Sequence, residues 1–256
     1  MLKQISNWLR ERRVARVLVT EEQWAKAEAA LPILSRWSSE ERTRLRQLAI
    51  EFIAEKQWSS ANGLVLTPQI QLIIALQACL LVFNLGLDWY RGWSGIIVYP
   101  GDFAIPRRIV DEVGVVHEYD DPALGEAWQG GPVIISWFDG ADCPQDVNPV
   151  IHEFAHKLDM LNGSSDGMPP LHSDMSRRTW CDAFGRAYAE LQRQLDLGED
   201  TAIDPYAAEE PAEFFAVASE AFFDAPAMLA TTYPDVFNQL CIFYRQNPLE
   251  PVPAEL

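Results

Sequence analysis

The run HEFAH at positions 152–156 holds the side chains of this sequence that are best suited to chemistry. Residues four apart on an α-helix lie one above the other, so the imidazoles of His152 and His156 can reach one metal ion. Glu153 projects beside them, where it can take a proton from a metal-activated water. The spacing therefore predicts a zinc centre for hydrolysis with Glu153 as its general base; the plainer interpretation is a pair of solvated helix histidines.

A catalytic zinc normally has three protein ligands and one open position for water, so a third ligand is needed. Metzincins use a histidine six residues after the second one, but that position is Asn162 here, which excludes their class. The other candidates are His172, in a loop-like stretch, and two glutamates on a helix that begins at Pro211. Glu213 and Glu220 are seven residues apart and share one helix face. We favour Glu213, because it lies nearer the helix start and precedes two phenylalanines that can pack on the core.

The helix that carries the motif has a clear start signal. Asn148 is a good helix cap, and Pro149 suits the first helical position, where the missing N–H costs no hydrogen bond. Ile151, Ala155 and Leu158 lie on the opposite face and can anchor the helix to the core.

The rest of the chain is predicted to be helical around a small sheet. Capping boxes at Thr20 and Ser38 each predict a helix start, and Thr67 before a proline predicts a third helix over residues 70–87. Later helices are expected at 176–194, 211–223 and 234–245. Short β-branched runs at 95–99 and 132–137 predict strands, and residues 114–119 are left open as a third.

These elements predict an α+β fold: a mostly helical zincin-like metallopeptidase domain with a small sheet. We expect one unit over residues 1–256, with an N-terminal helical region at 1–90 and the sheet and catalytic region at 91–256. The second strand, 132–137, precedes the motif helix and is a candidate for the sheet edge along which an extended peptide pairs.

Composition limits the partners. A formal charge of −17 repels phosphate, so nucleic acid is not expected as a partner. Glutamine and asparagine interrupt the apolar stretch 70–87, which favours a buried helix over a membrane span. With no signal-peptide pattern at the N-terminus, we expect a cytoplasmic protein. The four cysteines form no CxxC pair, which argues against a structural zinc and favours buried reduced thiols.

The motif and a second segment together resemble a known family. The run YAAEEPAEFFAVASEAFF from Tyr206 onward, paired with HEFAHKLDM at 152–160, is similar to the Mlc titration factor A (MtfA) family. Shorter segments from Leu31 to Trp128 extend the resemblance over nearly the whole chain. That family resembles the catalytic domain of anthrax lethal factor.

The resemblance implies a gluzincin-type zinc peptidase with one Zn²⁺ per chain, described as an aminopeptidase and acting on peptides. It implies Glu213 as the third zinc ligand and Tyr206 as the catalytic tyrosine, which can stabilise the oxyanion. It also implies binding to a transcriptional repressor of the Mlc type, which controls glucose phosphotransferase genes. The alternative from a different class is a non-catalytic repressor-binding protein whose zinc site is vestigial or structural.

Two features depart from the expected pattern. Glu210 precedes Pro211 and is a poor helix cap, so the start of that helix is weakly marked. Val217 stands where thermolysin-like enzymes place an acidic partner for the zinc-binding histidines, which leaves Glu220 and Asp159 as candidates for that supporting role.

Overall fold

The computed structural model describes residue 8 and residues 10–101, 103–110, 116–123, 125–138 and 147–250, with backbone alone for 103–110 and 116–123. The α-helices of this part of the chain are α2 (Glu21–Ala29), α3 (Ser39–Glu55), α4 (Pro68–Leu81), α5 (Pro149–Asp159), α6 (Arg177–Asp196), α7 (Pro211–Asp224), α8 (Pro226–Thr232) and α9 (Pro234–Tyr244). The 3-10 helices are η1 (Pro32–Arg36), η2 (Leu87–Tyr90), η4 (Met160–Asn162) and η5 (Pro205–Ala208). The strands are β1 (Gln57–Ser60), β2 (Gly95–Pro100), β3 (Phe103–Val110), β4 (Val116–Ala123), β5 (Gly125–Ala127) and β6 (Val133–Trp137).

The predicted helix starts are confirmed at the side-chain level. Both capping boxes form: the Thr20 and Ser38 hydroxyls accept from the backbone three residues on, and the glutamine and glutamate there reach back to the cap. Thr67 likewise caps α4. However, α4 ends at Leu81 rather than near residue 87. Just beyond the helix, the Phe83 ring packs at a tilt against the Trp37 ring, with ring centroids 4.4 Å apart.

A four-stranded sheet lies beside the motif helix, in the order β1-β2-β6-β5. The strands β1, β2 and β6 run parallel, and β5 pairs antiparallel with β6, opposing Gly125 to Ile135. This order contradicts the prediction that residues 132–137 form the sheet edge, because β6 lies between β2 and β5. The edge on that side is β5, whose three residues, Gly-Glu-Ala, carry too little β-forming character to be recognised in the sequence.

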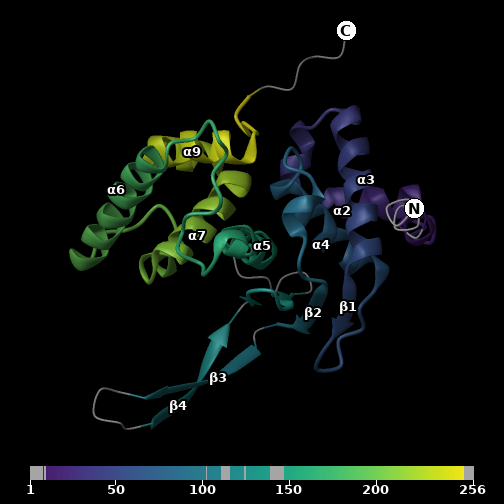
Figure 1. Cartoon of the computed structure of the whole chain (residues 1–256), viewed down its shortest axis with the longest axis horizontal. Helices are drawn as coiled ribbons and strands as arrows, with labels where there is room; N and C mark the ends of the chain where they lie inside the picture. Colours follow the sequence, from purple (N-terminus) through teal and green to yellow (C-terminus); the bar gives the residue numbers. More distant parts are fainter. Residues whose placement is uncertain are drawn as a thin grey trace.

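Two further strands form a separate hairpin. The strands β3 and β4 pair antiparallel and project away from the rest of the molecule (Figure 1). The strand β4 covers 116–119 of the stretch that was left open, while positions 114 and 115 lie outside the described residues.

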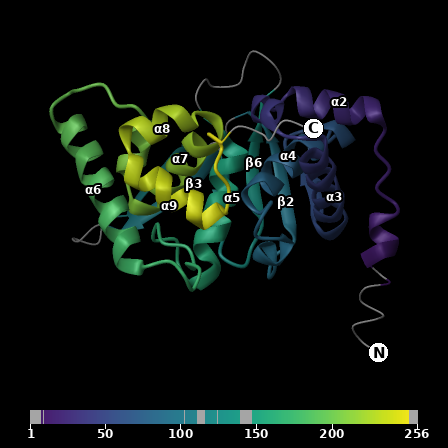
Figure 2. The same cartoon turned by 90° about the horizontal axis from the view of Figure 1, so that it is seen from above.

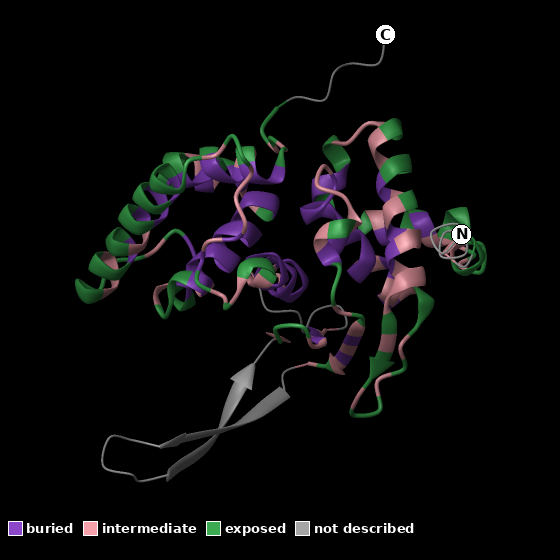
Figure 3. Ribbon diagram, in the orientation of Figure 1, coloured by how far each residue is buried: buried purple, intermediate pink, exposed green. Residues whose placement is uncertain are grey.

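The motif helix is central. Figure 1 and the view from above in Figure 2 place α2, α3 and α4 on one side of α5, with α6, α7 and α9 on the other. The helix α5 packs against α4, α7, β5 and β6. Figure 3 shows that the buried surfaces of the two helical groups face each other across this helix, so α5 lies in the core between them.

Two smaller expectations have mixed outcomes. The three cysteines within the described residues are free thiols, but only Cys79 is buried, while Cys241 is half-buried and Cys181 is exposed. Cys143 lies outside the described residues. No helix in the described part of the chain combines the length and the apolar character needed to cross a membrane.

Candidate metal centre

The start of α5 sets the direction of the motif side chains. The Asn148 side chain accepts a hydrogen bond from the Ile151 N–H at 3.1 Å, as the cap prediction requires. Ile151, Ala155 and Leu158 are all buried, which anchors the opposite face of the helix. The helix therefore directs His152 and His156 together towards α7.

Glu213 reaches the same point from a second helix. It lies in the first turn of α7, and the buried rings of Phe214 and Phe215 hold that turn in the core. Glu210 makes no side-chain cap there, so packing rather than capping positions this helix start.

Three side-chain atoms from the two helices converge on one point. The Oε2 of Glu213 lies 3.0 Å from the Nε2 of His152 and 3.3 Å from the Nε2 of His156. The two Nε2 atoms are 3.1 Å apart. Atoms bound tetrahedrally at about 2.0–2.1 Å from a zinc ion lie about 3.3 Å from one another, close to these separations. This set of one carboxylate and two imidazoles fits a metal ion.

The outer nitrogen of His152 is held by Glu220. Its Nδ1 lies 2.7 Å from Oε1 of Glu220, and the other oxygen of that carboxylate accepts the Asn148 backbone N–H at 2.5 Å. A carboxylate here makes Nδ1 the donor, which leaves the Nε2 lone pair directed at Glu213 and His156. Glu220 thus has the contact that the sequence proposed for it.

The outer nitrogen of His156 is held by a hydroxyl. Its Nδ1 lies 3.2 Å from Oγ of Ser165, whose hydroxyl donates to the Asp159 carboxylate at 2.7 Å. Asp159 therefore contacts His156 only through Ser165. Sequence reasoning missed Ser165, and no motif marks it, because it lies in a loop nine residues beyond the histidine.

With both outer nitrogens acting as donors, the three inner atoms all present lone pairs to one another. Such an arrangement is repulsive unless a positive charge lies between them. A proton on an imidazole can supply that charge: burial raises the pKa of Glu213, but hydrogen bonds with His152 and His156 outweigh it and lower that pKa to about 2. Burial lowers the pKa of His152, and its contacts with Glu213 and Glu220 reverse the effect, raising that pKa well above its usual value. The three side chains could therefore hold a metal ion in place of that proton.

Glu153 is the buried acid beside this cluster. Burial raises its pKa to about 7, although the neighbouring imidazoles act in the opposite direction. Its Oε2 has no hydrogen-bond partner among the described residues. A Cβ placed on Gly125 of the edge strand would lie 2.2 Å from Oε1 of Glu153, so only glycine at this position leaves room for the carboxylate. Glu153 therefore lies between the metal-binding atoms and the edge strand β5.

Tyr206 borders the cluster, and His172 does not. The backbone N–H of Tyr206 is held by Asp204 at the start of η5, and its ring centroid lies 6.2 Å from that of His152. Tyr206 is 47% exposed, so this border of the cluster is open to solvent. The His172 ring packs on Phe243 and its Nε2 hydrogen-bonds the Phe243 carbonyl oxygen at 2.8 Å, a purely structural role.

An α+β chain that brings two histidines of one helix and a glutamate of another to a single point has the architecture of a metallopeptidase. Its sequence matches the family described as "Glucose-regulated metallo-peptidase M90" over residues 5–245, and the chain belongs to that family.

Curated relatives agree with this assignment. The chain is 40% identical over 230 residues to "Mlc titration factor A" of Klebsiella pneumoniae subsp. pneumoniae, covering 88% of this chain and 86% of the relative. It is 39% identical over 224 residues to the protein of the same name from Escherichia fergusonii, covering 86% and 84%. The corresponding protein of Yersinia pestis is 37% identical over 232 residues, covering 89% and 85%.

Proposed function

We propose that this chain is a zinc-dependent peptidase of the gluzincin type, with one Zn²⁺ held by His152, His156 and Glu213. The convergence of their three inner atoms at 3.0–3.3 Å, with both outer imidazole nitrogens already engaged, is the observation that carries the proposal. When bound, zinc supplies a Lewis acid and lowers the pKa of a coordinated water to about 7.

Glu153 acts as the general base in this proposal. Its carboxylate lies beside the ligand cluster, has an oxygen with no described partner, and is buried away from competing water. It takes a proton from the attacking water and delivers it to the leaving amine of the cleaved bond. Tyr206, at the open side, donates a hydrogen bond to the carbonyl oxygen as negative charge develops there.

The edge strand β5 is the proposed binding line for the peptide. It ends the sheet order of the described strands on this side, and its glycine lies against Glu153, so a peptide paired to its outer edge would pass the general base. We propose an aminopeptidase as the finer form of the activity, in keeping with the family resemblance of the two motifs.

The direct test is a peptide library incubated with purified protein, with and without a chelator. The proposal expects cleavage that stops on chelation and returns with zinc, with single amino acids as products. Internal cuts would replace the aminopeptidase assignment by an endopeptidase. No chelator-sensitive cleavage of any peptide would remove the enzyme assignment.

We propose a second, compatible role as a cytoplasmic partner of a repressor of the Mlc type. The printed name of the relatives, "Mlc titration factor A", supports it. Glu153→Gln protein and zinc-free protein would be titrated against such a repressor by calorimetry. Binding that persists in both is expected if recognition is independent of hydrolysis, and this is also the result of the non-catalytic alternative. Absence of binding by the unaltered protein would exclude the role.

A further inference from the structure

The loop that follows the motif helix folds back onto it through one carboxylate. Asp159, the last residue of α5, is completely buried. Its Oδ2 accepts the Ser165 hydroxyl at 2.7 Å and the Gly167 backbone N–H at 2.8 Å. The loop thereby has two arms, one at each of these residues.

The Ser165 arm controls a proton on His156. A serine hydroxyl has one proton, and here it is directed to Asp159. The oxygen of Ser165 is then an acceptor for Nδ1–H of His156 at 3.2 Å. An imidazole that carries its proton on Nδ1 has its lone pair on Nε2, the atom that faces Glu213.

The Gly167 arm contacts the helix that carries Glu213. A Cβ on Gly167 would lie 2.4 Å from the carbonyl oxygen of Pro211, the first residue of α7, so the loop backbone packs directly on that helix start. Gly167 has a φ of +79°, which also favours glycine. Its carbonyl oxygen accepts from the Trp180 indole at 3.1 Å, which ties the same point to α6.

We propose that Asp159, Ser165 and Gly167 form a positioning unit that orients His156 and places the start of α7, and with it Glu213. This proposal rests on the proposed zinc site. Glu220 of α7 already orients His152 of α5, and the loop after α5 in turn contacts the start of α7. A loop that only ended α5 would not need to contact both the His156 imidazole and the first turn of α7.

We call the hydrogen-bonded chain from Asp159 through Ser165 to His156 the relay. The first experiment separates an effect on this relay from an effect on general stability. Ser165→Ala removes the acceptor for Nδ1, Ser165→Thr retains a hydroxyl, and Ser164→Ala is the control because Ser164 is exposed beside it. Zinc dissociation constants would be measured by chelator competition, and long-range ¹H–¹⁵N spectra of the zinc-free proteins would report the tautomer of His156. We expect Ser165→Ala to weaken zinc binding about 10-fold and to mix the tautomers, with both properties restored in Ser165→Thr and unchanged in Ser164→Ala.

The outcomes distinguish this unit from the zinc site itself. Unaltered zinc affinity and an unaltered tautomer in Ser165→Ala would overturn the relay while leaving the metal site intact. An unaltered chain that binds no zinc would overturn the proposed function instead, and with it this inference.

The second experiment tests the Gly167 arm. Gly167→Ala is expected to displace the first turn of α7 and weaken zinc binding, with an altered Co²⁺ absorption spectrum reporting changed ligand geometry. Gly185→Ala in the exposed face of α6, where an added Cβ meets nothing, is the matched control. A folded Gly167→Ala protein with normal zinc affinity and spectrum would remove this arm. If Gly167→Ala does not fold, Trp180→Phe is measured in its place, because it removes the indole donor to the Gly167 carbonyl oxygen. Normal zinc affinity and an unaltered spectrum in that variant would remove this arm.

Discussion

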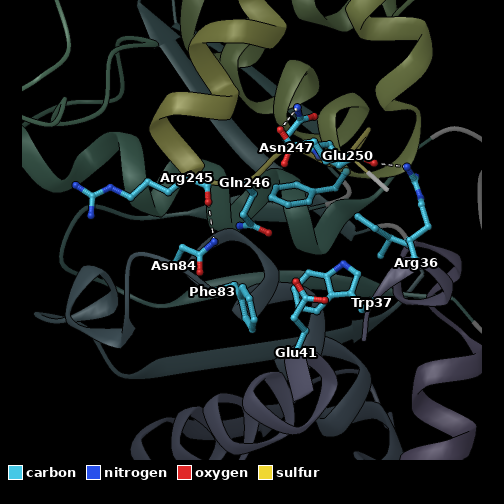
Figure 4. Close-up of a pocket in the computed structure, with 12 residues that line it drawn as sticks. Arg36, Trp37, Glu41, Phe83, Asn84, Arg245, Gln246, Asn247 and Glu250 are labelled. Atoms are coloured by element: carbon cyan, nitrogen blue, oxygen red, sulfur yellow. Dashed lines mark hydrogen bonds between the residues drawn. The ribbon is translucent and has the colours of Figure 1, made fainter. Parts of the chain in front are cut away.

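The candidate metal centre and the hollow between the N-terminal region and residues 245–250 differ in how their polar groups are arranged. The hollow has a volume of ≈ 240 Å³ and is lined by the Trp37 and Phe83 rings among other residues (Figure 4). Several of its polar groups are already paired. Asn84 donates to the Arg245 carbonyl oxygen at 2.6 Å, and the Arg36 guanidinium donates to the Pro248 carbonyl oxygen.

The metal centre shows the reverse arrangement. Its inner nitrogen and oxygen atoms face one another as acceptors, and Glu153 keeps a buried oxygen without a described partner. A buried polar group left unpaired costs about 1–3 kcal/mol, so the unpaired oxygen of Glu153 is a candidate contact for a ligand. The contrast teaches that converging metal-ligand atoms with a buried acid beside them, rather than open volume, mark the candidate site of this chain.

The largest expected effect comes from Glu153, the proposed general base. Glu153→Gln keeps the shape of the side chain but removes its ability to accept a proton, so peptide turnover should fall by about 10²–10⁴-fold. Zinc content measured on the purified variant should stay near one equivalent per chain. Glu209→Gln, at an exposed glutamate, is the control. Normal turnover in Glu153→Gln would transfer the base to another residue.

The next effect is on the metal itself. Glu213→Ala deletes one of the three converging atoms, so zinc affinity should fall by about 100-fold or more, beyond the usual cost of losing an outer hydrogen bond. Chelator competition measures this value directly. A variant that retained the original affinity would move the third ligand away from α7.

A change at the hollow should act on stability alone. Gln246 donates to the Leu80 carbonyl oxygen at 2.8 Å, and Gln246→Ala leaves that acceptor unpaired. The free energy of unfolding in urea should fall by about 1 kcal/mol, while zinc affinity and turnover stay unchanged. A loss of activity larger than the loss of folded protein would break the comparison, because it would give the hollow a catalytic role.

The smallest effect is the pH dependence of the free energy of unfolding that comes from the largely buried Lys56. Lys56 donates to the carbonyl oxygens of Tyr90 and Trp93, and burial lowers its pKa from 10.5 to about 8. Between these values the unfolded chain binds more protons than the folded chain, so stability rises with pH across this window. Relative to Lys56→Met, the unaltered chain should gain roughly 1 kcal/mol from pH 8 to pH 10, because the ammonium is partly solvated. Urea unfolding at both pH values measures the difference, and a constant difference would contradict the shift.

The sequence alone was sufficient wherever the interaction is local. The capping boxes at Thr20 and Ser38, the cap at Asn148 and the four-residue spacing of His152 and His156 all involve neighbours within one helical turn. Glu213 was also proposed from the sequence, because it lies nearer the helix start and precedes two phenylalanines, and the structure places its carboxylate beside the two histidines.

Tertiary structure decided what depends on distant parts of the chain. The early end of α4 could not be read from composition, since Val82 and Phe83 are apolar and buried whether or not the helix continues. The short edge strand β5 is defined by its pairing with β6 and by the space that Glu153 needs at Gly125. Ser165 gains its role only because the loop returns to His156. Local hydrogen bonds and periodicity depend on residues within a few positions of one another, so the sequence alone determines them. A strand edge or a hydrogen-bond relay forms only when packing brings separate segments together.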